Sequence, residues 1–133
     1  MEKALLTTTE LNCLSRVILD ASITVHKEMG PGLLESVYQH CLVKELRNRR
    51  VNVNIMVQVP LYYKGDRLNK DYVIDVLVED EIILELKAHE VTLPVHEAQI
   101  ISYLKITNKR LGFLINFNVP LLKEGFRRYV NKF

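Results

Sequence analysis

The sequence has little net charge and little cysteine. Each of these restricts the kinds of binding site that the protein can form. Its 18 lysines and arginines nearly balance its 16 aspartates and glutamates, which leaves a formal net charge of +2. No strong overall field attracts polyanions, so any affinity for nucleic acid has to come from local patches. The two cysteines are too few to build a zinc site. We expect Cys13 and Cys41 to be buried free thiols of a cytoplasmic protein.

Long apolar runs are also missing. The longest ones end well short of the ~18 residues that a membrane helix needs, so no membrane partner is expected. The N-terminal residues lack the apolar core of a signal peptide, which again predicts a cytoplasmic location. A length of 133 residues, with 48% hydrophobic and 26% charged residues, is typical of one globular domain that spans residues 1–133.

Hydrophobic periodicity and turn residues predict the elements in order. Thr7 and Glu10 are spaced as a capping box that begins a helix, and the Gly30–Gly32 segment ends it. The pattern predicts helices at about 8–28, 33–47 and 95–107, and strands at about 51–63, 72–78, 82–87 and 111–117. Pro60 marks a bulge or an edge strand.

The last predicted element is less distinct. Residues 121–130 fit a helical turn or a final strand, and we favour a strand at 126–130. The resulting α-α-β-β-β-α-β order, with this late element, is typical of an α/β fold built on a mixed sheet.

Three charged residues lie inside the predicted apolar hairpin of residues 72–87. They are Asp75 in the first strand and Glu85 and Lys87 in the second. Charge in a buried strand costs free energy unless it is paired or binds a metal. One interpretation is structural: Glu85 and Lys87 form the exposed face of an amphipathic strand, and Asp75 lies near an edge. The other interpretation is that the three residues form a functional site.

The length of the hairpin turn decides whether the two acids meet. A two-residue turn would place Asp75 and Glu85 on opposite faces of the sheet, because side chains alternate along a strand. A three-residue turn centred on Asp80 pairs Val78 with Ile82. It therefore pairs Asp75 with Glu85. We predict this turn, with Asp80 in the left-handed conformation that it needs.

Asp75 and Glu85, opposed on one face of the sheet, would have Cβ atoms about 5 Å apart and would repel each other. A divalent cation offsets this repulsion, and Mg²⁺ sites use a few carboxylates together with waters and substrate phosphate oxygens. Lys87 would lie beside the ion without ligating it. There its ammonium group can orient or deprotonate a water, or stabilise developing negative charge.

Glu35 lies in the apolar arc of the second predicted helix and is therefore expected to face the body of the protein. If Gly32 is the N-cap, Glu35 occupies the third helical position, where a glutamate caps the helix and complements its dipole. This structural role is compatible with a place at the site. Tyr38 is expected to be a core aromatic residue whose hydroxyl group is bonded near the same place.

Several motifs, taken in order, resemble one known family. The segment Gly32-x-x-Glu35-x-x-Tyr38 resembles the signature of the GxxExxY protein family, which is placed in the PD-(D/E)XK nuclease-like superfamily. The resemblance covers roughly residues 12 to 130. Further matching segments are Tyr63–Gly65, Glu85–Ala88, Pro94–Gln99 and Leu114–Pro120. It implies a restriction-endonuclease-like core, with a central mixed β-sheet of four or more strands flanked by helices.

The resemblance also implies roles for the charged residues. Asp75 and Glu85 match the metal-binding acids of the superfamily. Lys87 matches the catalytic lysine of the Glu-x-Lys motif, and Glu35 matches a helical acid that completes the metal site. The implied cofactor is Mg²⁺ or Mn²⁺.

A second motif is implied on the third helix. Gln99 and Tyr103 match a Gln-x-x-x-Tyr motif beside the active site, where they would position phosphate or orient Lys87. Ile74 stands where the motif has proline, a departure that leaves the following acid intact. The backbone carbonyl of Leu86 is a further expected metal ligand.

These residues predict a divalent-metal-dependent nuclease that hydrolyses phosphodiester bonds in DNA or RNA. One alternative is a non-catalytic nucleic-acid-binding or regulatory module that retains the nuclease fold and its acids. Another is a protein-interaction partner whose acids are structural. A chain of this size has limited surface with which to hold a duplex, which leaves room for a homodimer.

Basic residues suited to phosphate contacts fall into two clusters. One cluster follows the third helix and the other surrounds the end of the second: Lys105, Lys109 and Arg110, and Lys44, Arg47, Arg49 and Arg50. Each cluster is either a nucleic-acid surface or a solvated face. His96 either reaches phosphate or caps the start of the third helix, and we favour the capping role.

Overall fold

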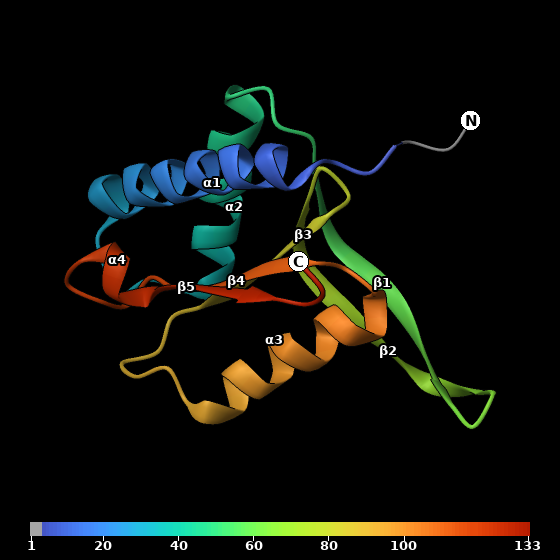
Figure 1. Cartoon of the computed structure of the whole chain (residues 1–133). Helices are drawn as coiled ribbons and strands as arrows, with labels where there is room; N and C mark the ends of the chain where they lie inside the picture. The colour runs from blue at the N-terminus through green and yellow to red at the C-terminus, as the bar shows by residue number, and fades with distance from the viewer. Residues whose placement is uncertain (1–3) are drawn as a thin grey trace.

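The computed structural model describes residues 4–133 as four helices and five strands (Figure 1). In chain order they are α1 (Thr8–Met29), α2 (Glu35–Asn48), β1 (Val53–Tyr63), β2 (Asp66–Val78), β3 (Ile82–Lys87), α3 (Pro94–Thr107), β4 (Leu111–Asn116), α4 (Leu122–Gly125) and β5 (Phe126–Val130). The strands form one sheet in the order β1-β2-β3-β4-β5, in which β3 and β4 run parallel and the other neighbours run antiparallel. The predicted α/β class and mixed sheet are confirmed.

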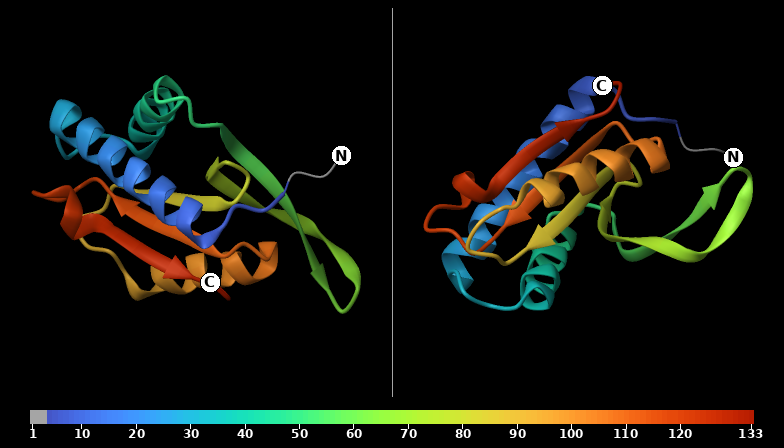
Figure 2. Two further views of the ribbon diagram at one scale, coloured as in Figure 1. Left: turned by 45° about the horizontal axis from the view of Figure 1, so that its top comes forward. Right: turned by 90° about the horizontal axis from the view of Figure 1, so that it is seen from below.

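Helices cover both faces of this sheet. α1 and α2 lie on one face and α3 lies on the other (Figures 1 and 2). The larger core cluster joins α1 and α2 to the sheet, and its fully buried side chains include Leu11, Tyr38 and Leu84. A smaller cluster, which includes Ile83 and Leu104, lies between the sheet and α3. Within residues 4–133, the model contains no helix with the length and apolar character needed to cross a bilayer.

α1 begins and ends as predicted. The Thr7 side chain accepts a hydrogen bond from the Glu10 N–H at 3.1 Å, and the Glu10 carboxylate accepts one from the Thr7 N–H at 3.0 Å. Gly30, with a φ of 71°, ends the helix and donates its N–H to the carbonyl oxygen of His26 at 2.8 Å. Each bond satisfies a helix-end group that has no partner within the helix.

The N-cap of α2 lies two residues later in the chain than the sequence predicts. The sequence pattern placed Gly32 at the N-cap and Glu35 at the third helical position. In the structure Leu34 is the N-cap and Glu35 is the first helical residue, with no side-chain capping bond at this end. The capping role predicted for Glu35 is therefore wrong.

Tyr38 explains the late start of α2. Its buried hydroxyl group donates a hydrogen bond to the carbonyl oxygen of Gly30 at 2.6 Å and accepts one from the N–H of Leu33 at 3.1 Å. These two bonds hold the loop between α1 and α2 as a separate turn, in which Gly32 adopts a φ of 94° that other residues rarely tolerate. The prediction of a core tyrosine with a satisfied hydroxyl group is confirmed.

β1 and β2 form a long antiparallel ribbon that projects from the body of the protein (Figures 1 and 2). Lys64 and Gly65 connect them in a two-residue turn, and both have positive φ angles, as the twist of a tight hairpin requires. The register shifts between Pro60 and Tyr62, and β1 is an edge strand of the sheet. Both features predicted for Pro60 are therefore present.

The turn between β2 and β3 has the predicted length. Val78 pairs with Ile82 across it. Glu79 and Asp80 both adopt the left-handed conformation, with φ angles of 50° and 61°. The prediction of a three-residue turn with a left-handed Asp80 is confirmed, and Glu79 shares that conformation.

β2 breaks its regular alternation at Asp75. Ile74 packs in the cluster under α3, whereas Val76, only two residues later, packs in the cluster under α1 and α2. Residues two apart point to the same face of a regular strand. The β1 ladder likewise skips Met56, which has a φ of 49°. The backbone ladder between β2 and β3 stops one pair before Asp75 and Glu85.

The end of the chain contains both of the elements that its pattern suggested. Leu122–Gly125 forms the short helix α4, and Phe126–Val130 forms β5, as favoured from the sequence. β5 pairs antiparallel with β4 and is the second edge strand of the sheet.

The cysteines are free thiols, but their predicted burial is wrong. Cys13 is exposed on α1, and Cys41 is half-buried on α2. The core-facing stripe of α1 runs through Leu11 and Ile18, which are fully buried. Cys13 lies two residues from Leu11, about 200° around the helix, and therefore points outward.

Candidate active site

β3 carries Glu85 and Lys87 on the face of the sheet that α3 covers. Ile83, two residues before Glu85, packs in the cluster under α3, and strand alternation points Glu85 and Lys87 the same way. Glu85 is only 7% exposed, and Lys87 is half-buried. The structural interpretation, in which these residues line an exposed strand face, is therefore wrong for Glu85.

Asp75 is fixed at both its carboxylate and its backbone. Its Oδ2 atom accepts a hydrogen bond from the N–H of Leu86 at 3.1 Å, in place of a further step of the backbone ladder. From α2, the Gln39 side-chain amide donates a hydrogen bond to the backbone oxygen of Asp75 at 3.0 Å. The carboxyl groups of Asp75 and Glu85 are close enough that each affects the pKa of the other.

Tyr72 of β2 bonds the Glu85 carboxylate, and Tyr103 of α3 supports the Tyr72 ring. The Tyr72 hydroxyl group donates a hydrogen bond to Glu85 Oε1. The Tyr103 ring stacks on the Tyr72 ring, with ring centroids 3.4 Å apart and an interplanar angle of 19°. Tyr103 therefore reaches the site through Tyr72, which is itself buried.

Tyr72 and Gln39 are site residues that the sequence reasoning missed. Tyr72 lies three residues before Asp75, and in a regular strand this spacing turns the two side chains to opposite faces. The break in alternation at Asp75 is what brings Tyr72 to the Glu85 side. Gln39 is the residue after Tyr38, but nothing in the sequence pattern connects Gln39 with Asp75.

Burial is the largest cause that raises the pKa of both carboxyl groups. Burial and then the charge of Asp75 raise the pKa of Glu85 to about 8, against the lowering effects of the Tyr72 hydroxyl group and the Lys87 charge. The pKa of Asp75 is also raised, chiefly by burial, although the Leu86 N–H and Lys87 favour its ionised form. At neutral pH the pair therefore retains a proton on Glu85. A cation beside the pair would favour the doubly ionised form.

Glu35 lies at the rim of the site. It is exposed, and its Oε1 atom lies 3.6 Å from His89 Nε2, while its charge contributes to raising the pKa of Asp75. The prediction that Glu35 faces the body of the protein is wrong. Glu35 is the first residue of α2 and therefore lies at the end of the helix. The buried side chains Leu42 and Leu46 lie further along the helix, in the core.

The acids of the site therefore form a pair rather than a triad. Throughout the described range of 4–133, no three His, Cys, Asp or Glu side chains come together closely enough to hold a metal ion. Asp75 and Glu85 interact with each other, and Glu35 acts on Asp75 through its charge. The backbone of Leu86 lies beside the pair, since its N–H is bonded to Asp75.

α3 places its polar residues in three different settings. Tyr103 is half-buried against Tyr72, whereas Gln99, one turn earlier, is exposed. His96 Nδ1 accepts a hydrogen bond from the N–H of Leu93 at 3.3 Å at the start of the helix. The favoured capping role of His96 is confirmed.

Two of the three basic residues at the end of α3, Lys109 and Arg110, are used within the fold, whereas Lys105 is exposed. Arg110 pairs with Glu81 at 2.7 Å and donates a second bond to the carbonyl oxygen of Leu6 at 2.6 Å. The Lys109 ammonium group donates a hydrogen bond to the backbone oxygen of Asp80 at 2.7 Å. These contacts secure the N-terminal segment and the β2–β3 turn.

The basic cluster at the end of α2 divides into two parts. Arg49 pairs with Asp20 of α1 and with Glu45 of its own helix. Three other cations form no ion pair with any residue of the described part of the chain: Lys44, Arg47 and Arg50.

One known protein family matches almost the whole length of the fold. A family model described as the PD-(D/E)XK nuclease superfamily matches residues 12–129, from the first turns of α1 into β5. The matched region includes the acid pair, Lys87 and the α3 residues. No curated protein and no solved structure matches the chain.

Proposed function

The chain belongs to the PD-(D/E)XK nuclease superfamily, and on this premise we propose that it hydrolyses phosphodiester bonds in DNA or RNA with the help of Mg²⁺ or Mn²⁺. The observation that carries the proposal is the carboxyl pair formed by half-buried Asp75 and buried Glu85, with Lys87 two residues after Glu85 along the same strand face. The mixed sheet, covered by helices on both faces, supports a restriction-endonuclease-like core.

The donor set of the site suits a hard divalent cation. Asp75 and Glu85 offer carboxylate oxygens, and the Leu86 carbonyl is proposed as a further oxygen ligand. Burial, and then the charge of Asp75, disfavours the ionised form of Glu85, so positive charge beside the pair would stabilise that form. Glu35 would add negative charge from the rim. When bound, such a cation supplies Lewis-acid polarisation of a phosphate oxygen.

Lys87 is proposed as the residue that acts on the attacking water. Its charge favours the ionised forms of both Asp75 and Glu85, so its ammonium group lies within electrostatic reach of the pair. An ammonium group in this place can orient a water for attack and stabilise the negative charge that develops on the phosphate. The backbone of Lys87 has a separate task, because its carbonyl oxygen accepts a hydrogen bond from Phe117.

The α3 residues are proposed to act beside the acids. Tyr103 holds Tyr72 by stacking, and Tyr72 in turn holds the Glu85 carboxylate. Tyr103 is therefore a positioning residue. Gln99 is exposed one turn away on the same helix, where its amide group can contact phosphate or orient Lys87.

A cleavage panel tests the proposal. Single-stranded, duplex and branched DNA and RNA are incubated with the protein in Mg²⁺ or Mn²⁺, beside the Asp75→Ala and Lys87→Ala variants. We expect both variants to lose cleavage and to keep the circular dichroism spectrum of the native fold. Native-like cleavage by both variants would contradict the assignment. Binding without turnover in Mn²⁺ would instead support a non-catalytic nucleic-acid-binding module.

A further inference from the structure

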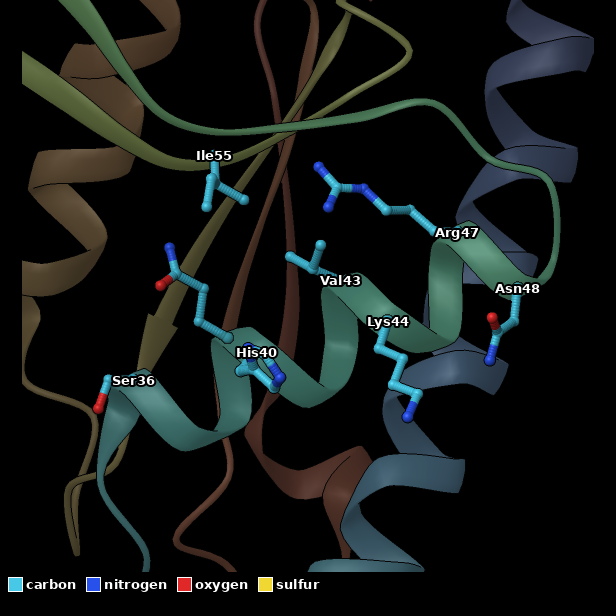
Figure 3. A pocket seen from close by; sticks show the side chains of 8 residues that line it. Ser36, His40, Val43, Lys44, Arg47, Asn48 and Ile55 are labelled. Carbon is cyan, nitrogen blue, oxygen red and sulfur yellow. The ribbon is translucent and has the colours of Figure 1, made fainter.

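A groove runs between α2 and β1, on the side of the ribbon that faces α2 (Figure 3). It has a volume of about 450 Å³. Its lining side chains come from one face of α2 and from a single β1 residue: Ser36, Gln39, His40, Val43, Lys44, Arg47, Asn48 and Ile55. In Figure 3 Arg47 extends from the helix toward β1, which makes it one end wall of the groove.

A second hollow continues the groove past the end of α2. Its volume is about 620 Å³, and Arg47 lines both hollows. Arg50, Asn52 and Asn54 supply most of its other polar groups. The two hollows adjoin at Arg47, and we call them together the α2–β1 groove.

The α2–β1 groove is cationic. None of the residues that line it is acidic, and its basic residues are His40, Lys44, Arg47 and Arg50. The carboxylate of Glu79 lies beside this lining, where it accepts a hydrogen bond from the Asn52 N–H at 2.8 Å.

The Arg47 side chain is fixed against β1 by a hydrogen bond. One guanidinium N–H group donates to the carbonyl oxygen of Val53 at 3.0 Å. A guanidinium group has five N–H donors, so this bond fixes the side chain and leaves donors for an anion. By contrast, Arg49 is directed to α1 by its ion pair with Asp20 and takes no part in the groove.

One end of the α2–β1 groove lies beside the backbone of Asp75. Gln39 lines the groove, and its side-chain amide donates a hydrogen bond to the backbone oxygen of Asp75. On the strand side, Ile55 lines the groove and pairs with Val76, the residue after Asp75. An extended ligand in the groove would therefore pass close to Asp75.

We propose that the α2–β1 groove binds the phosphate backbone of the nucleic-acid strand that enters the active site. The inference rests on the proposed nuclease function and adds to it the surface that holds the substrate. Evenly spaced phosphates match a row of cations that have no carboxylate partners, and the apolar Val43 and Ile55 side chains offer contact to sugars or bases. His40, Lys44, Arg47 and Arg50 contact phosphates and read no sequence.

Equilibrium binding without turnover tests this proposal. Fluorescence anisotropy is measured in EDTA with short fluorescein-labelled single-stranded DNA, single-stranded RNA and duplex DNA, over a range of salt concentrations. The test variant is Lys44→Ala/Arg50→Ala, which keeps the Arg47 bond to β1. The matched control is Lys27→Ala/Lys123→Ala, which removes the same charge from exposed positions outside the groove.

We expect the test variant to bind the preferred nucleic acid at least about tenfold more weakly than the native protein, since charged phosphate contacts are among the stronger hydrogen bonds. The slope of log K against log salt should fall by about 0.7 for each single-strand phosphate that the variant no longer neutralises, or by about 0.9 for each duplex phosphate. The control variant should stay within about twofold of the native protein, since rim charges that touch no phosphate contribute little.

Three results would overturn the groove assignment. They are equal affinities for the test and control variants, no binding of any probe by the native protein, and displacement of the probe by polyglutamate at equal charge concentration. The Asp75→Ala variant should bind as tightly as the native protein. Binding that depends on the groove in a protein that never cleaves would leave this inference standing and remove the nuclease proposal. Cleavage together with binding that does not depend on the groove would remove this inference and leave the nuclease proposal standing.

Discussion

The Tyr72 hydroxyl group donates a hydrogen bond to Glu85 from a strand position that regular alternation, counted from Leu77, would turn to the other face of the sheet. The break at Asp75 makes this contact available. Tyr72 therefore stabilises the ionised form of Glu85, as its lowering effect on the pKa of Glu85 indicates. It does so from a ring that is stacked on Tyr103.

The Tyr72→Phe variant should lose this donor while it keeps the stacked ring. We expect a loss of about 1–3 kcal/mol in the free energy of unfolding, because the bond is buried and involves a carboxyl group. We also expect the Mn²⁺ concentration for half-maximal cleavage to rise about tenfold or more, since groups that orient metal ligands affect metal affinity. Tyr62→Phe, at an exposed ribbon position, is the control. Equal behaviour of the two variants in urea unfolding and in metal titration would contradict the role of Tyr72.

The stability of the metal-free protein should depend on pH through Glu85. Its pKa is about 8 in the folded protein and near the ordinary 4.5 when unfolded, so the folded state binds more protons between these values. The free energy of unfolding should therefore fall as the pH rises from about 4.5 to 8, by up to a few kcal/mol. Urea unfolding in EDTA across this range measures the effect.

Glu85→Gln provides the matched variant for this pH series. It removes the titrating group, so its stability should change less with pH and should exceed that of the native protein at pH 8. Glu28→Gln removes an exposed carboxyl group and should keep the native pH dependence. A flat pH profile for the native protein, or a steep one for Glu85→Gln, would show that Glu85 is not the source.

Divalent cations should stabilise the fold through the same pair. A ligand that binds only the folded state at a hundred times its Kd adds about 2.7 kcal/mol to the free energy of unfolding. Thermal unfolding in Mg²⁺ or Mn²⁺ should therefore give a higher Tm for the native protein than in EDTA. The Asp75→Asn/Glu85→Gln variant should show no such rise. A metal-dependent rise in that variant would place the ion elsewhere.

The loop between α1 and α2 should depend on the Tyr38 hydroxyl group. Tyr38→Phe keeps the ring stacked on Phe117, whose centroid is 4.5 Å away, but removes the bonds to Gly30 and Leu33. We expect a loss of about 1–3 kcal/mol in the free energy of unfolding and faster amide exchange at Leu33. Tyr63→Phe, exposed on the ribbon, should have the native stability. Unchanged exchange in Tyr38→Phe would show that other contacts fix the loop.

The sequence predicted those features that depend on local periodicity and turn length. The capping box at Thr7 and the register of Val78 with Ile82 follow from residues close together in the chain. Parity then required Asp75 and Glu85 to share a side. The sequence thus predicted that the two acids lie close together, although the strand ladder ends one pair before them and β2 breaks its alternation at Asp75.

The remaining site features depend on tertiary contacts that break local rules. Tyr72 reaches Glu85 only because β2 changes face at Asp75. Gln39 reaches Asp75 across the gap between α2 and the sheet. Glu35 lies at the rim because Tyr38 bonds to the preceding loop and delays the start of α2. None of these contacts has a signature in hydrophobic period or residue spacing.

The most direct test of the central claim is the initial rate of oligonucleotide cleavage in Mn²⁺ by the native protein and by Lys87→Ala. Lys27→Ala, at an exposed position on α1, is the control. The account predicts that the native protein and the control cleave at the same rate, that EDTA abolishes cleavage, and that Lys87→Ala is about 100-fold slower or more. Equal rates for the native protein and Lys87→Ala would contradict it.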